Sequence, residues 1–172
     1  MGRTTKMFLT IAIVFTFVWV AWATARSVED IQFSKDCTTH IQRAVDVDNV
    51  ETAKNELSKA IQYAEEHNLT EGVVSIFFNR SKNDIGMWYK NMKTAHEKLE
   101  NLPEDATENE KANILMQLGE TLTTNGQNGR FVTVPEGIFV YPNNVAYFWW
   151  GLISFMLAGV FWLAFDISRT YD

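Results

Sequence analysis

Two long runs without a charged residue constrain this 172-residue chain more than any other feature. They cover Met7–Ala25 and Val145–Phe165 and are 19 and 21 residues long. A helix of about 20 apolar residues spans the hydrocarbon core of a bilayer. We therefore predict a mainly α membrane protein with two transmembrane helices. A soluble enzyme domain is excluded as a description of the whole chain.

The segment between the two runs, residues 26–144, is polar and strongly acidic. It holds 12 Lys and Arg against 19 Asp and Glu, a net charge of −7. Because a phosphate backbone would repel such a surface, we do not expect nucleic acid among the partners. The predicted order is an N-tail (1–6), a membrane helix (7–25), a soluble domain (26–144), a second membrane helix (145–165) and a C-tail (166–172).

Basic residues beside the two runs predict the orientation of the chain. Arg3 and Lys6 lie in the N-tail and Arg169 in the C-tail, whereas the central segment is too long for its charge to decide topology. Short tails rich in Lys and Arg stay in the cytoplasm. We expect both termini to be cytoplasmic and the central domain extracytoplasmic, as in a protein of the bacterial inner membrane or an equivalent membrane.

The first run also has features of a cleaved secretory signal. Ala23-Thr24-Ala25 has the small-x-small pattern that precedes a cleavage site. The apolar core of a signal is only about 7–15 residues long. This run is longer and carries Trp19 and Trp22 near its far end, where tryptophan suits a membrane–water interface. An uncleaved anchor is the interpretation that the run favours.

Apolar spacing predicts that the central domain is an antiparallel helical bundle. Residues 7–47 contain neither Gly nor Pro, so one long helix can run from the membrane into the domain. Its apolar stripe continues beyond the membrane through Val28, Ile31, Cys37, Ile41 and Ala44. The next helix follows after two or three residues, and so short a connection makes two helices pack antiparallel.

Capping pairs mark where the other helices of the domain begin. Asp48 with Glu51 predicts one helix, and Thr107 with Glu110 predicts another, which Asn125-Gly126 would close. Between them, a helix opening near 81–84 and ending at Pro103 has an apolar seam with alternating steps of three and four. The seam residues are Ile85, Trp88, Met92, Ala95, Leu99 and Leu102.

Three short runs rich in β-branched and aromatic residues predict a small sheet. One covers 72–79, and the other two, 131–134 and 138–141, lie on either side of a Pro-Glu-Gly turn. The last two runs would form a β-hairpin, and the first could pair with it. Because the hairpin precedes the second membrane helix closely in sequence, we expect it near the membrane surface.

The second apolar run contains small residues at helical spacing. Gly151, Ser154 and Ala158 share one face with Gly159 beside them, and such faces let another helix approach closely within a membrane. We expect this face to pack most often against the first helix of the same chain. The predicted interfacial anchors are Trp19, Trp22, Tyr147, Trp149 and Trp150.

No arrangement of residues typical of catalysis occurs in the sequence. Phosphate loops, paired cysteines and nucleophile motifs are absent, and neither apolar run holds an ionisable residue that would mark a proton or ion pathway. Cys37 and His40 could share a helix face, with His96 as a third ligand, but three ligands are not brought together by spacing alone. We expect no enzyme activity, no cofactor and no metal.

A concentration of aromatic residues leaves two interpretations open. Packed in the core, these side chains need no further role. Gathered on the surface, they would form an apolar patch that contacts a partner or the membrane. The residues concerned are Phe77, Phe78, Trp88, Phe139 and Tyr141.

In topology alone, the arrangement resembles that of bacterial chemoreceptors and related sensors, which place a helical bundle between two membrane helices. Seven residues follow the last apolar run, so we expect no signalling output domain. The sequence favours a non-catalytic structural or accessory subunit of a homo-oligomeric or larger membrane assembly. Its partners would be lipid and itself or another membrane protein. Alternatives are a ligand-sensing module that signals through a partner and an oligomeric pore or phage-type lysis protein.

Overall fold

The computed structural model describes residues 2–76, 81–126 and 129–171, and over these ranges the protein is mainly α-helical. The chain divides into two compact units. One consists of Met1–Glu29 with Pro142–Asp172, and the other of Asp30–Tyr141. The predicted long first helix is confirmed, since helical structure is unbroken from Arg3 to Asp46.

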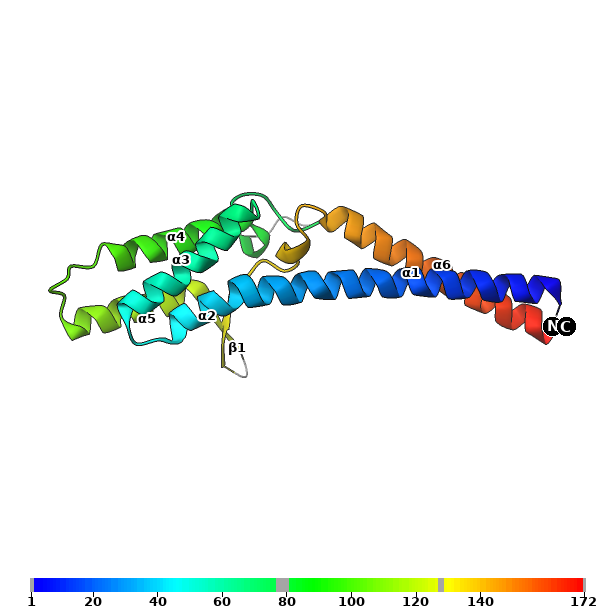
Figure 1. Cartoon of the computed structure of the whole chain (residues 1–172), viewed down its shortest axis with the longest axis horizontal. Coiled ribbons are helices and arrows are strands. Elements are labelled where there is room, and N and C mark those ends of the chain that lie inside the picture. The colour runs from blue at the N-terminus through cyan, green and yellow to red at the C-terminus, as the bar shows by residue number, and fades with distance from the viewer. Residues whose placement is uncertain (1, 77–80, 127–128, 172) are drawn as a thin grey trace. The chain divides into compact units, whose positions relative to one another are not determined.

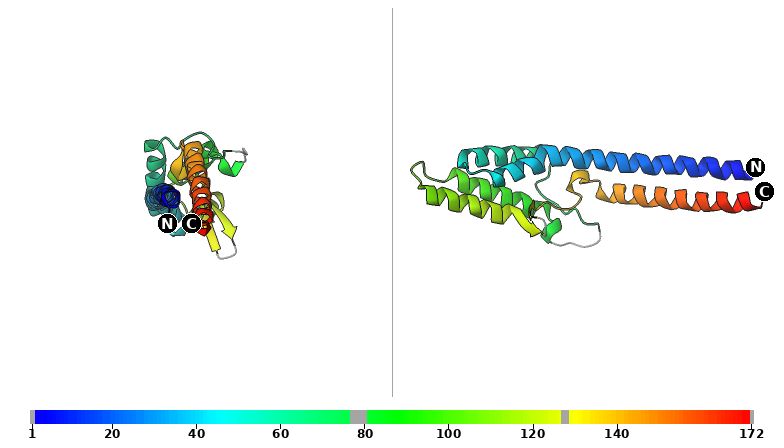
Figure 2. Two further views of the ribbon diagram at one scale, coloured as in Figure 1. Left: turned by 90° about the vertical axis from the view of Figure 1, so that its right-hand side faces the viewer. Right: turned by 90° about the horizontal axis from the view of Figure 1, so that it is seen from below.

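The first unit is a pair of long apolar helices, α1 (Arg3–Phe33) and α6 (Asn144–Thr170), which lie side by side (Figures 1 and 2). Thr5 near the start of α1 contacts Ser168 near the end of α6, whereas Trp22 contacts Tyr147. The two helices therefore run in opposite directions, and the two ends of the chain lie at the same end of the pair.

The second unit is a helical bundle with one apolar core. Its longer helices are α2 (Thr39–Asp46), α3 (Val50–Glu66), α4 (Ile85–Glu100) and α5 (Glu108–Leu122). The seam predicted for the third of these is confirmed over Ile85–Leu99, whose seam residues are all buried. The largest fully buried side chains of the unit are Ile41, Leu57, Ile85, Met92 and Ile138.

Side-chain caps determine where these helices begin. The predicted Thr107–Glu110 capping box is confirmed, with both of its reciprocal hydrogen bonds present. The prediction for α3 is wrong by one residue. Asn49 is extended, and its side-chain oxygen accepts a hydrogen bond from the Thr52 N–H at 2.9 Å, so Asn49 rather than Asp48 closes the first turn.

A wide π-turn at Ser34–Thr38 separates α1 from α2. Phe33, Cys37 and Ile41 are all buried, although two steps of four residues rotate a regular α-helix about 80° away from its starting face. A π-turn bonds to the fifth residue instead of the fourth, so it turns the chain less per residue and keeps the three side chains aligned.

The apolar stripe predicted to continue beyond the membrane is wrong for its first two residues, because Val28 and Ile31 are exposed. Both precede the π-turn on α1 and lie more than about 130° around the helix from Phe33, which is buried. The face of the helix that enters the core is therefore set by Phe33 and continues through Cys37.

The small sheet is a hairpin of β1 (Thr123–Gly126) and β2 (Gly129–Val132), with Thr124 opposite Phe131. Helix α5 therefore ends at Leu122 and not at the predicted Asn125-Gly126, since the β-branched Thr123-Thr124 begins a strand.

The predicted hairpin of 131–134 with 138–141 is wrong. Ile138–Val140 forms a 3₁₀ turn, in which Ile138 bonds to Pro135 and Val140 bonds to Gly137, so these backbone groups cannot join a ladder. In 72–76, an isolated bridge joins Val73 to Asp84. The remainder of the predicted strand, 77–79, lies outside the described residues.

Candidate functional site

The face of α6 that packs on α1 is the one rich in small residues. Gly151 and Ser154 are buried there, Ala158 is half-buried, and Phe161 follows three residues later. A Cβ atom on Gly151 would lie 2.6 Å from indole carbons of Trp22, closer than real Cβ contacts. Glycine is therefore required at this position for the indole to lie against the α6 backbone.

Polar groups at this contact are paired. The Trp22 indole N–H donates to the backbone oxygen of Tyr147 at 2.7 Å, and the hydroxyls of Thr5 and Ser168 are 2.6 Å apart. The Ser154 hydroxyl donates to the Trp150 carbonyl at 2.6 Å. Paired polar groups of this kind lower the cost of placing a helix pair in apolar surroundings.

Aromatic rings of the two helices pack against one another along the pair. The rings of Phe15 and Phe161 are stacked with centroids 5.8 Å apart, and Phe8 lies 6.5 Å from the same ring. Trp19 lies 6.0 Å from Phe155. These contacts run along both helices, so the pair is held by packing over much of its length.

The outer surface of the pair is apolar. Both helices are long and apolar enough to cross a membrane, and most of each apolar stretch is exposed in the protein. Exposed apolar areas on monomeric soluble proteins rarely exceed a few hundred Å². The more exposed large side chains include Phe17, Val14, Phe155, Met156, Leu163 and Ile167.

The predicted anchors do not all lie on the outer surface of the helix pair. Trp149 and Trp150 are exposed, whereas Trp22 and Tyr147 make the hydrogen bond between the helices. Trp19 is half-buried against its neighbours. Gly159, which the sequence places beside the small-residue face, is exposed, and no atom lies within 4 Å of where its Cβ would be.

The aromatic residues of the central unit do not share one surface. Trp88 is buried, and its ring lies 6.3 Å from that of Phe33, so the core interpretation holds for this residue. Phe139 and Tyr141 are half-buried against the core. Phe77 and Phe78 lie outside the described residues. The interpretation that Trp88 belongs to a surface patch is therefore wrong.

The residues considered as metal ligands are not brought together. In the described part of the chain, no group of three His, Cys, Asp or Glu side chains is placed to hold a metal ion. Cys37 is fully buried, with its thiol 3.8 Å from the Ala60 carbonyl, while His40 contacts Glu56 on α3. His96 lies beside Glu100 on its own helix.

Burial makes Cys37 a probe of bundle opening, because desolvation raises the pKa of its thiol to about 12. The usual pKa of a cysteine thiol is near 9.0, so ionisation alone lowers the reactivity of the folded thiol roughly a thousandfold at neutral pH. We expect negligible reaction with a thiol reagent in the folded protein and full reaction in denaturant, followed by absorbance. Rapid labelling of the native chain would contradict the burial.

Glu56 links α2 to α3 in a small charged network. One carboxylate oxygen lies 2.6 Å from His40 Nδ1, and the other accepts a hydrogen bond from Lys59 at 2.6 Å. The hydrogen bonds from Lys59 and His40 lower the pKa of Glu56 below its usual value near 4.5. The ionised carboxylate is therefore favoured by folding.

The variant Glu56→Gln should lose about 1.5–3 kcal/mol of unfolding free energy at pH 7, the range for a hydrogen bond to a charged group. Because the pKa of Glu56 is lower in the folded state than in the unfolded state, the ionised carboxylate stabilises the native state at pH values above the unfolded-state pKa near 4.5. This stabilisation is lost as the pH falls through the folded-state pKa. The wild-type advantage should thus shrink below pH 4. Urea unfolding of both chains at pH 7 and pH 3 measures this advantage. An equal difference in unfolding free energy at the two pH values would contradict the stabilising role of the ionised Glu56.

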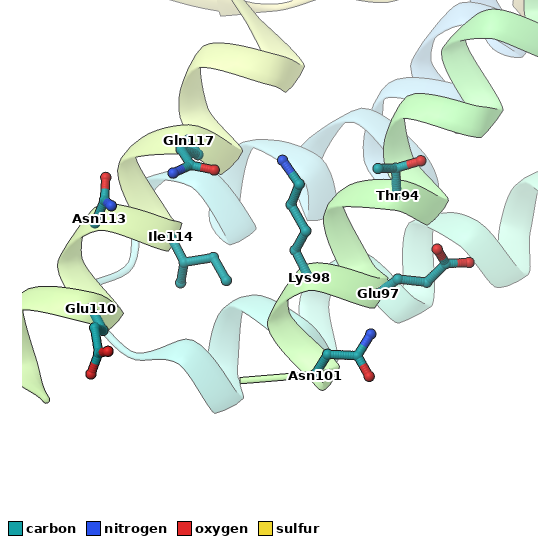
Figure 3. A pocket seen from close by; sticks show the side chains of 8 residues that line it. All are labelled: Thr94, Glu97, Lys98, Asn101, Glu110, Asn113, Ile114 and Gln117. Carbon is teal, nitrogen blue, oxygen red and sulfur yellow. The ribbon is translucent and has the colours of Figure 1, made fainter. Parts of the chain in front are cut away.

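An open groove lined mostly by polar and charged residues lies between α4 and α5 (Figure 3). It measures about 490 Å³, within the range of small-molecule pockets. Figure 3 shows Lys98 rising between the two helices toward Gln117, with Ile114 facing the hollow. The rest of the lining is Thr94, Glu97, Asn101, Glu110 and Asn113, a mixture of hydrogen-bond donors and acceptors.

No protein-family model matches this chain, and no curated protein or solved structure shows significant similarity to it. Its class must therefore be taken from its own residues. The fold defines a helical protein with two candidate membrane-spanning helices packed together, a separate bundle and a small two-stranded sheet.

Proposed function

We propose that the chain is a non-catalytic integral membrane protein that acts as a structural or accessory subunit of a homo-oligomeric or larger assembly. In this proposal α1 and α6 span the membrane, both termini are cytoplasmic, and the unit Asp30–Tyr141 is extracytoplasmic. Its partners are lipid and either a second copy or another membrane protein.

The exposed apolar surface of the α1–α6 pair is the observation that carries this proposal. The two helices bury small residues and paired polar groups against one another and leave large apolar side chains outside. In water such a surface would be strongly unfavourable, at about 25 cal/mol for each Å² exposed. In a bilayer the same surface contacts lipid tails, so the membrane explains the arrangement.

Charge at the ends of the pair supports the proposed orientation. Arg3, Lys6 and Arg169 are exposed at the end where the chain begins and finishes. Positive residues near membrane helices favour the cytoplasmic side. The acidic central unit then lies on the other side, away from the anionic lipid of the cytoplasmic leaflet.

Thiol labelling tests the topology, because the single native cysteine is buried. We would place one cysteine in the N-terminal turn, Thr4→Cys, and one in the exposed loop after α4, Glu104→Cys. A membrane-impermeant maleimide should label Glu104→Cys in intact cells and Thr4→Cys only after permeabilisation. The unmodified chain is the control. Release of the protein from membranes by alkaline carbonate, or equal labelling of both variants in intact cells, would overturn the proposal.

Ligand sensing is a second candidate function, and the groove between α4 and α5 is the observation that favours it. Its donors and acceptors suit a neutral or zwitterionic polar molecule such as a sugar or an amino acid. A ligand at a hundred times its dissociation constant stabilises the folded state by about 2.7 kcal/mol. Thermal unfolding of the full chain with sets of sugars and amino acids is the test, and Lys98→Ala should abolish any shift.

A further inference from the structure

A small apolar hollow lies where the start of α4 meets the end of α5 and the residues after β2. It measures about 160 Å³, and its apolar lining comes from Met87, Trp88, Leu122 and Pro135. Met87 stands at its edge and is 47% exposed. Polar and charged side chains complete the lining, namely Lys82, Asp84, Asn91, Thr121 and Thr133.

This hollow is too small for a typical small-molecule ligand, whose pockets measure about 300–1,000 Å³. An engineered apolar cavity of about 150 Å³ in another protein takes up one benzene molecule. The space here therefore matches a single phenyl ring. An apolar floor with a polar rim is also the arrangement in which an anchor side chain contributes most to a protein–protein contact.

An exposed phenyl ring lies next to the hollow. Phe131 is 55% exposed and pairs with Thr124 across the hairpin. The hydroxyls of Thr124 and Thr133 are 2.8 Å apart, so Thr124, Phe131 and Thr133 share one face of the sheet. Since Thr133 lines the hollow, the ring and the hollow are neighbours on the same side of the bundle unit.

We propose that this face joins two copies of the chain, with Phe131 of each copy inserted into the hollow of the other. A two-fold contact requires a self-complementary surface, and an anchor beside a matching hollow meets that requirement. The surface made of Phe131 and the hollow is called the Phe131 face.

Charge on the Phe131 face favours a second copy over a basic or acidic partner. Lys82 and Asp84 balance one another, and neither makes an ion pair with a described residue. Asp84 also caps α4 by accepting a hydrogen bond from the Met87 N–H, and in the proposed contact the lysine of one copy faces the aspartate of the other. The remainder of residues 26–144 carries a net charge of −7, so a locally neutral area such as this one lowers the repulsion between two copies.

The inference rests on the proposed function in one respect, that the chain acts by assembling. The test uses the full chain in detergent and in lipid nanodiscs, with mass measured by light scattering over a range of concentrations. The wild type should dimerise, and Phe131→Ser should dimerise only at concentrations about tenfold higher or more, the effect of losing a central anchor. Met116→Ser is the matched control, since Met116 is 52% exposed, close to the 55% of Phe131, but lies on α5 outside the Phe131 face.

A monomeric wild type, or a Phe131→Ser chain that dimerises like the wild type, would overturn the inference. So would a complex with a different protein that Phe131→Ser abolishes, although that result would leave the proposed function intact. Release from membranes by carbonate would instead overturn the proposed function and leave the dimer contact to be judged by its own mass measurement.

Cross-linking provides a second test that does not depend on loss of binding. Chains carrying Phe131→Cys and chains carrying Met87→Cys are mixed under mild oxidation, with native Cys37 inaccessible in both. A mixed disulfide between the two chains is expected, because Met87 stands at the edge of the hollow that receives residue 131. Chains carrying Met116→Cys in place of Met87→Cys should not cross-link, and equal cross-linking of both pairs would overturn the assignment.

Discussion

Replacing Gly151 with leucine should weaken the packing of α1 against α6. The first atom of the new side chain would lie 2.6 Å from the Trp22 indole, so the indole must move. Moving it also breaks the 2.7 Å hydrogen bond from the indole N–H to the Tyr147 oxygen. Overpacking of this kind costs about 1–3 kcal/mol, and an unpaired donor in apolar surroundings adds to that cost.

The hydroxyl contact between Thr5 and Ser168 provides the measurement. With cysteines at both positions, a disulfide should form readily, because their side-chain oxygens are 2.6 Å apart. In the Gly151→Leu background the rate of disulfide formation should fall about tenfold, equivalent to about 1.4 kcal/mol. The protein is kept in lipid nanodiscs, and the product is measured by the mobility of the cross-linked chain.

Gly159→Leu is the control for this experiment. It makes the same chemical change on the same helix, but no atom lies within 4 Å of its new Cβ. The disulfide should therefore form at the unmodified rate. An equal loss with both leucines would show that helix α6 as a whole, rather than the contact of Gly151 with Trp22, responds to substitution.

Local signals in the sequence predict the helices well, because each depends on a few neighbouring residues. The seam of α4 and the Thr107–Glu110 box are examples. The hairpin prediction fails, because an apolar run such as Ile138–Val140 fits a strand and a buried turn equally well. Only the backbone bonds to Pro135 and Gly137 distinguish the two.

The candidate contacts are harder to predict, because they join residues far apart in the chain. Spacing on α6 indicates a close-packing face at Gly151 but does not identify Trp22 as the side chain lying on it. The sequence therefore predicts Trp22 only as an interfacial anchor. It does not predict the hydrogen bond that the Trp22 indole N–H donates to the backbone oxygen of Tyr147. The Phe131 face could not be predicted either, since it depends on the register that pairs Phe131 with Thr124.

The largest effect on stability is expected from Ile41→Ala in α2. Ile41 is fully buried, and shortening such a side chain costs about 2–5 kcal/mol, because apolar contacts are lost and a cavity remains. Ile31→Ala is the matched control, since the same residue type ten positions earlier in the same continuous helical stretch is 66% exposed. Its effect should stay within about 0.5 kcal/mol.

The native thiol reports this difference directly. Cys37 lies one turn before Ile41 and reacts only when the bundle opens, so its labelling rate follows the free energy of opening. A loss of about 2–5 kcal/mol should speed labelling of the Ile41→Ala chain by about thirtyfold or more, while the Ile31→Ala chain should label like the wild type. If both variants labelled at the wild-type rate, Ile41 would not be part of the core, and the π-turn would not be aligning it with Phe33 and Cys37.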